Sequence, residues 1–162
     1  MKSGTSIMQR AGIAALAALA CLPGAANSQE ALANEYGYKL AGKTAQASYF
    51  LSGIQRGAEP DSIEAWIWTV LPEPEGAAGE AHDAVAQRSV LRCEGRSIEP
   101  LKTESYLAGV VTGVTVAPPQ LPADVAGTPM EAIWKVACDM GARFSAKTVM
   151  DLSAVYAIAK KP

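Results

Sequence analysis

The clearest periodic pattern in the chain is an alternation of apolar side chains over Ser62–Leu71, with the sequence SIEAWIWTVL. Successive residues of an extended strand point to opposite faces, so this stretch presents two apolar sides. A strand with two apolar sides belongs in the middle of a sheet, and we expect one of its faces to be only half covered. The residues on one side are Trp66, Trp68 and Val70, and those on the other are Ala65, Ile67 and Leu71.

Five further stretches have strand-like composition and are bounded by turn residues. The Pro- and Gly-rich segment Pro72–Asp83 is predicted to be a long surface loop. A tight turn is expected at Glu94-Gly95, with Gly95 supplying the positive φ that a hairpin requires. The five stretches are Tyr36–Ala41, Gln46–Ile54, Ala84–Glu94, Arg96–Tyr106 and Leu107–Val116.

A helix is predicted over Thr128–Gly141, where apolar residues recur at helical spacing. Thr128 and Glu131 have the spacing of a capping box, and Pro129 suits the first helical position. Gly141 is expected to end the helix in the left-handed conformation. A second amphipathic helix is predicted within Ser145–Lys160. The fold class predicted is therefore α+β: an antiparallel sheet of about six strands, with one helix on a face and a second, C-terminal helix.

Residues 1–28 have the features of a secretory signal. Lys2 and Arg10 precede the apolar run Ala11–Leu22, which is too short to span a bilayer, and small residues offer a cleavage site before Gln29. Lipid attachment at Cys21 is the alternative, although the residues before it fit a lipoprotein signal poorly. We then expect a leader over residues 29–35, a domain over 36–141 and a C-terminal helical extension over 142–162.

Charge and hydropathy narrow the range of partners. The chain has 14 Lys and Arg against 16 Asp and Glu, and the predicted signal contains two of the basic residues and none of the acidic ones. The exported chain is thus acidic, which argues against general nucleic-acid binding. No apolar run after the signal is long enough to cross a membrane. The expected location is the periplasm or the outer cell surface.

Two of the three cysteines remain after export, and an even pair in an exported chain indicates a disulfide between Cys93 and Cys138. Cys93 lies on the same side of its strand as Leu91, so that side should face the helix that carries Cys138.

His82 is the only histidine, and a structural zinc site needs four ligands. We expect no metal and no cofactor. No nucleophile elbow, Cys-His pair or phosphate loop is present, so no catalytic residue is predicted.

Three arginines at alternate or nearby positions are candidates for binding. Arg88 and Arg92 share a side of one predicted strand, and Arg96 begins the next. Together they form a basic strip that would attract an anionic partner. The alternative is pairing with nearby carboxylates on a solvated face of the sheet. Trp66 and Trp68 are the other binding candidates.

At this point the order of elements resembles that of the surface-adhesin protein E family of Gram-negative exported proteins. The similarity covers about Tyr36 to Met140. It is carried by four segments in order: YFLSGIQR at Tyr49–Arg56, EAWIWTVL at Glu64–Leu71, RSVLRCEGRSIEPLKTESY at Arg88–Tyr106, and AIWKVACDM at Ala132–Met140.

The resemblance implies a curved antiparallel sheet of about six strands, a Cys93–Cys138 bridge from sheet to helix, and a non-enzymatic role in binding matrix or plasma proteins, with homodimers formed in the founding type. This chain departs from the family in three ways. The residues before Cys21 fit a lipoprotein signal poorly, the chain extends about twenty residues past Cys138, and Gly53 stands where serine is common. The expected function is an exported envelope protein that binds a macromolecular partner. The alternative is a periplasmic structural or stress-related protein without a specific ligand.

Overall fold

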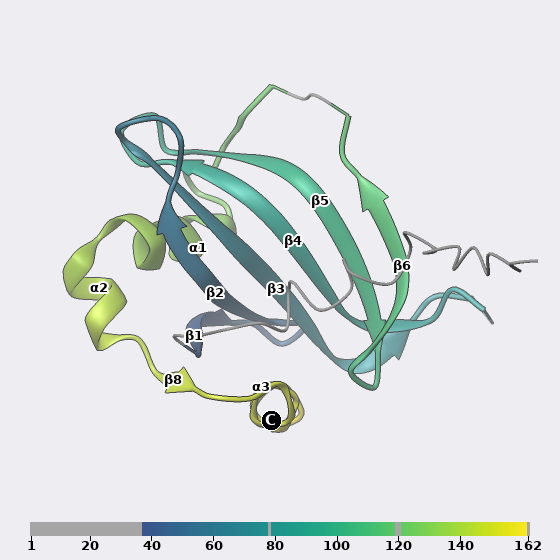
Figure 1. Cartoon of the computed structure of the whole chain (residues 1–162). Helices are drawn as coiled ribbons and strands as arrows, with labels where there is room; N and C mark the ends of the chain where they lie inside the picture. The colour runs from purple at the N-terminus through teal and green to yellow at the C-terminus, as the bar shows by residue number, and fades with distance from the viewer. Residues whose placement is uncertain (1–36, 78, 119–120, 162) are drawn as a thin grey trace, which may run out of the picture.

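The computed structural model describes residues 37–77, 79–118 and 121–161, and these residues form one antiparallel sheet with helices on both of its faces (Figure 1). The predicted signal at 1–28, with Cys21, and the leader at 29–35 lie outside the described residues. The strand order is β6-β5-β4-β3-β2-β1-β8, and β7 pairs with β5. The strands are β1 Tyr38–Lys43, β2 Ser48–Arg56, β3 Ser62–Glu75, β4 His82–Arg92, β5 Ser97–Leu107, β6 Val110–Val116, β7 Ala123–Asp124 and β8 Thr148–Val149.

The predicted antiparallel sheet with a helix bonded to it by a disulfide is confirmed, whereas the number of strands is larger than the six predicted. Six strands, β1 to β6, correspond to the predicted stretches. The other two, β7 and β8, contain two residues each. A two-residue strand is too short to show an alternating pattern, so its pairing is determined only by the fold around it.

The central position predicted for the Trp-bearing strand is confirmed, because β3 has three neighbours on either side along the sheet path. One face of β3 packs its indoles against α3 (Leu152–Ala159), which contributes the buried Val155 and Ala159. The other face packs Ala65 and Ile67 against α1 (Met130–Cys138). The alternation in the sequence therefore fills two separate cores, one on each side of the sheet.

The disulfide joins the end of β4 to the last residue of α1. Cys93 and Cys138 are bonded with their Cα atoms 5.5 Å apart, which lies in the usual range for a disulfide. Leu91, two residues before Cys93, is fully buried in the core beneath α1. The bond thus fixes the helix above the face of the sheet that the apolar pattern assigns to it.

Both predicted ends of the first helix are wrong in detail. Thr128 does not cap it, since its hydroxyl donates to the carbonyl oxygen of Val125 (2.7 Å) in the turn before the helix, and no side chain caps the N-terminus. At the other end, α1 stops at Cys138 before reaching Gly141. Asp139 has an extended backbone and its carboxylate accepts from the N–H of Gly141 (2.8 Å), which starts α2 (Met140–Ser145). Asp is a strong N-cap, and here it starts a second short helix near the position where the first was predicted to end.

Two predicted turns also differ from the structure. At the β4–β5 turn the positive φ (47°) belongs to Arg96 and not to Gly95. The loop predicted over Pro72–Asp83 is shorter, since β3 continues to Glu75 and β4 begins at His82. Its prolines are tolerated because the β3–β4 register shifts between Val70 and Glu75, and no ladder hydrogen bond is required from them there.

The C-terminal extension completes both the sheet and one core. β8 pairs with β1, with Val149 opposite Tyr38, and α3 then covers the indole face of β3. The predicted helix over Ser145–Lys160 is shorter than expected, and Thr148–Val149 is a strand. Within the described ranges, no helix combines the length and apolar character needed to span a bilayer.

Candidate interaction surface

The outer strand β6 is the most exposed apolar element among the described strands. Its sequence, VVTGVTV, contains no charge and no proline, and three of its valines are more than half exposed: Val110 (67%), Val114 (54%) and Val116 (74%). Natural edge strands are usually protected by charges, prolines or bulges. Only one of these devices is present, a register shift where β6 passes Ser105 and Tyr106 of β5.

The backbone of β6 has one side that faces away from the sheet. The N–H of Ala117 donates to the carbonyl of Leu101 on β5 (3.0 Å). Because successive residues of a strand alternate the direction of their backbone groups, Thr115 also faces β5, while the N–H groups of Val114 and Val116 point outward. None of the described strands pairs with β6 on that outer side. These groups are therefore placed to bond an added strand.

The hairpin that carries β6 is held in place at its turn, by the start of β4 and by α3. Its turn has positive φ at Ala108 (51°) and Gly109 (81°), as in the two-residue turns that best match strand twist. The N–H of Ala108 donates to the Asp83 carboxylate (3.1 Å), which also accepts from the hydroxyl of Tyr156 on α3 (2.8 Å). Asp83 is only 6% exposed, so the turn that begins β6 is anchored to a buried group.

Beside β6, the face of the sheet contains a charged and aromatic cluster. Val116 lies opposite Lys102, whose ammonium group is 2.8 Å from the Glu104 carboxylate and 5.8 Å from the centroid of the Trp66 ring. Glu104 is fully buried and accepts from the hydroxyl of Tyr106 (2.6 Å). Burial, followed by this hydrogen bond, raises the pKa of Tyr106. The Lys102–Glu104 ion pair thus lies next to the neutral phenol of Tyr106 and is partly covered by the Trp66 ring.

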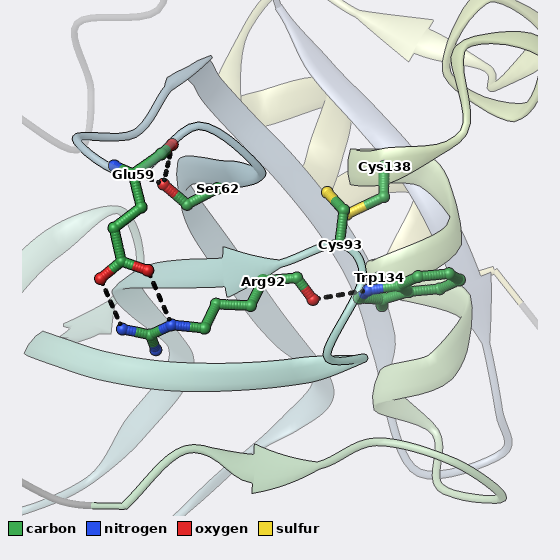
Figure 2. The surroundings of a disulfide bond; sticks show 6 residues. All are labelled: Glu59, Ser62, Arg92, Cys93, Trp134 and Cys138. Carbon is green, nitrogen blue, oxygen red and sulfur yellow. Dashed lines mark hydrogen bonds and ion pairs between the residues drawn. A yellow bond between two sulfur atoms is a disulfide. The ribbon is translucent and has the colours of Figure 1, made fainter.

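Arg88 and Arg92 extend across the same face, and each has a carboxylate partner. Arg88 pairs with Glu64 of β3. Arg92 donates through Nε and Nη2 to both oxygens of Glu59 (3.1 and 3.0 Å) and through Nη1 to Glu99 (2.8 Å), as Figure 2 shows for the Glu59 pair. Hydrogen bonding to Arg92 lowers the pKa of the Glu59 carboxyl. Both arginines are thus paired with carboxylates on the face of the sheet, which is the predicted alternative to a basic strip.

Arg96 lies apart from the other two arginines, next to α1. Its guanidinium pairs with Glu131 and stacks 5.0 Å from the centroid of the Trp134 ring. Trp134 in turn donates its indole N–H to the carbonyl of Arg92 (3.2 Å), beside the disulfide (Figure 2). The N–H of Gly127 and then Arg96 lower the pKa of the Glu131 carboxyl. Arg96 therefore helps to hold α1 on the sheet and does not continue the row of Arg88 and Arg92.

The two tryptophans that were candidates for binding are largely inside the protein. Trp68 has no exposed surface, makes an edge contact with Tyr38 (5.4 Å between ring centroids), and donates its indole N–H to Ser52 (3.0 Å). Trp66 is 5% exposed. Neither ring offers a broad surface to a partner, whereas the valines of β6 do.

The sequence predicts β6 as a strand but does not predict that it lies at an edge of the sheet. The signal that was present is a run of β-branched residues without a charge or proline, which is the composition of a strand open to pairing.

His82, next to the loop, has only the Glu80 carbonyl within hydrogen-bonding distance (3.3 Å) among the described contacts. Nowhere in the described residues do three His, Cys, Asp or Glu side chains gather to hold a metal ion.

Comparison with known proteins adds no relative: no family model, curated protein or solved structure matches this chain. The resemblance to the surface-adhesin protein E family therefore stays a prediction. One of its departures has a conformational reason, because Gly53 has φ of 56°, where a serine would be strained.

Proposed function

We propose that this chain is an exported, non-enzymatic envelope protein that binds another protein by accepting an extended segment along β6. The observation that supports the proposal best is the outward backbone of an exposed, uncharged edge strand. Strand addition takes its affinity from main-chain hydrogen bonds and its specificity from alternate side chains. Here the outward N–H groups of Val114 and Val116 would supply the main-chain hydrogen bonds. The exposed valines would supply the specificity.

The face of the sheet beside β6 indicates which side chains the partner segment should carry. Residues of the added segment that lie over the β5–β6 face would meet Val114 and Val116, which are apolar, and then Lys102, which pairs with Val116. A partner strand with alternating apolar and polar residues fits this surface, since its apolar side would cover the valines. The role in the envelope rests on the predicted signal and on the resemblance to surface-adhesin protein E.

Export is tested on the mature chain. Mass spectrometry of the protein isolated from the envelope of the cells that produce it should find an N-terminus at Gln29 and an intact disulfide between Cys93 and Cys138. A mass carrying lipid on Cys21 would show an anchored protein instead. A cytoplasmic chain with residues 1–28 retained would contradict export.

The binding is tested by photocrosslinking in those cells. A photoreactive amino acid in place of Val116, which is 74% exposed, should give a discrete crosslinked protein, and the same group in place of the exposed Ala58 should not. The variant Val114→Pro removes an outward N–H without removing a bond to β5, so it should abolish the crosslink. Val114→Thr keeps that N–H and is the matched control, which should crosslink normally.

Equal crosslinking in Val114→Pro and Val114→Thr would exclude strand addition. Absence of any specific crosslink at β6, together with altered envelope integrity in cells that lack the protein, would favour the structural or stress-related role. A crosslink between two copies of the chain would identify the partner as a homodimer.

A further inference from the structure

A pocket of about 320 Å³ lies beside the first two strands and α2, at the opposite edge of the sheet from β6. It is bordered by Lys39 of β1, by Ile54 of β2, and by Met140, Arg143 and Phe144 of α2, with two glycines completing it. Its volume falls at the small end of the range for pockets that bind small molecules. Cations and apolar side chains thus meet around one cavity.

The cations at this pocket have no acidic partner within it. None of the described residues lining it is Asp or Glu. Lys39 donates to the neutral hydroxyl of Thr148 (3.2 Å). The Nε of Arg143 is buried and has no hydrogen-bond partner among the described residues, and desolvation lowers the pKa of this guanidinium. A buried N–H donor without a partner is costly, and a bound anion that accepts from it would offset that cost.

The remaining wall is apolar and exposed. Phe144 is 77% exposed and Met140 is 56% exposed, and both belong to a helix of six residues with no buried residue of its own. Ile54, on the sheet side, is only partly buried against the core beneath α1. The lining of the pocket therefore combines two cations with apolar side chains that the rest of the described fold leaves at least partly exposed.

We propose that this pocket binds an amphipathic carboxylate, with its head group at Lys39 and Arg143 and its alkyl tail against Ile54, Met140 and Phe144. The planar fork of an arginine matches a carboxylate with two parallel hydrogen bonds. The limited volume selects a medium-chain acid and not a long-chain one. This site is separate from β6, so its occupancy does not depend on a protein partner.

The direct test is a titration of the exported, disulfide-bonded chain followed by two-dimensional NMR, with decanoate, 1-decanol and acetate as probes. Decanoate should shift the amide signals of pocket residues in a saturable manner. Decanol keeps the tail without the charge, and acetate keeps the charge without the tail. Each should bind at least about tenfold more weakly, the factor expected when a hydrogen bond to a charged group or a buried tail is lost.

Variants separate the two halves of the site. Arg143→Gln should reduce decanoate affinity at least about tenfold and leave decanol affinity unchanged. Phe144→Ala should weaken decanoate and decanol by the same factor, because it removes only contact with the tail. Lys160→Gln is the matched charge control: Lys160 caps α3, which packs on the other face of the sheet, and its removal should change neither affinity.

Equal affinity of the wild-type chain for decanoate and decanol would overturn the proposal, as would decanoate-induced shifts scattered outside the pocket. An unchanged preference for decanoate in Arg143→Gln would also exclude the head-group assignment. Circular dichroism checks that each variant is folded. If Arg143→Gln does not fold, Lys39→Gln makes the same comparison at the second cation.

Discussion

The hydroxyl of Tyr156 donates to the carboxylate of Asp83, 2.8 Å away and 73 positions earlier in the chain. The same carboxylate accepts from the N–H of Ala108 in the β5–β6 turn. One buried side chain at the start of β4 thus links the C-terminal helix, the sheet and the hairpin that carries β6. The C-terminal extension therefore supports the edge strand that we propose as the binding site.

Tyr156→Phe should lower the free energy of unfolding by about 1 to 3 kcal/mol, because it removes a hydrogen bond to a charged and largely buried acceptor. The measurement is urea unfolding of the disulfide-intact protein. Asp83→Asn in the same background completes a double-mutant cycle, and the two changes should be non-additive. If the two losses of unfolding free energy simply add, the hydrogen bond between Tyr156 and Asp83 contributes nothing to stability.

Removing the disulfide with Cys93→Ala and Cys138→Ala should cost about 4 kcal/mol, the chain-entropy expectation for a separation of 45 residues. The loss should be local at first, since α1 is the element that the bond holds on the sheet. After reduction, amide exchange should therefore accelerate at Ile133 in α1 before it does at Ile67 in β3. Simultaneous acceleration in both elements would show that the helix and the sheet unfold as one unit.

Stability should fall in alkaline solution because buried tyrosines resist ionisation. Burial, with a smaller contribution from the Asp151 charge, raises the pKa of Tyr38 from 10.0 to about 12. Burial also raises the pKa of Tyr106 and Tyr156. A raised pKa means that the folded state keeps a proton that the unfolded state releases, so this stabilisation is complete below pH 10 and is lost as the pH rises toward 12.

Urea unfolding at a series of pH values measures that slope, and Tyr38→Phe should make it shallower by removing one of the three groups. Tyrosinate absorbance should appear together with unfolding. Complete tyrosine ionisation near pH 10 in a chain that remains folded would contradict the assignment of these phenols to the core.

The main architecture was predictable because it follows from side-chain alternation and cysteine pairing. Trp66 and Trp68 alternate with Ala65 and Ile67, and this pattern alone places their strand between two cores. The short strands were not predictable, since Thr148 and Val149 pair with β1 only after α2 has brought them to its edge. The end of the first helix was mispredicted because two nearby residues can each end a helix. Gly141 was expected to do so, but Asp139 ends α1 and caps α2.

The candidate surface was only partly predictable, because charge partners come from different strands. Arg92 binds Glu59 in the turn between β2 and β3, and no spacing in the sequence reveals that contact. Arg96 leaves the row because its backbone adopts a left-handed turn and directs its side chain to α1. What the sequence does show in β6 is an absence of protective charge, but whether a strand lies at an edge depends on the order of strands in the sheet.

The most direct measurement of the central claim is amide hydrogen exchange along β6, in the isolated protein and in its crosslinked complex. The N–H groups of Val114 and Val116 should exchange rapidly in the isolated protein and become protected in the complex. Thr115, whose N–H faces β5, should be protected in both and serves as the internal control. Unchanged exchange at Val114 and Val116 in the complex would contradict strand addition at this edge.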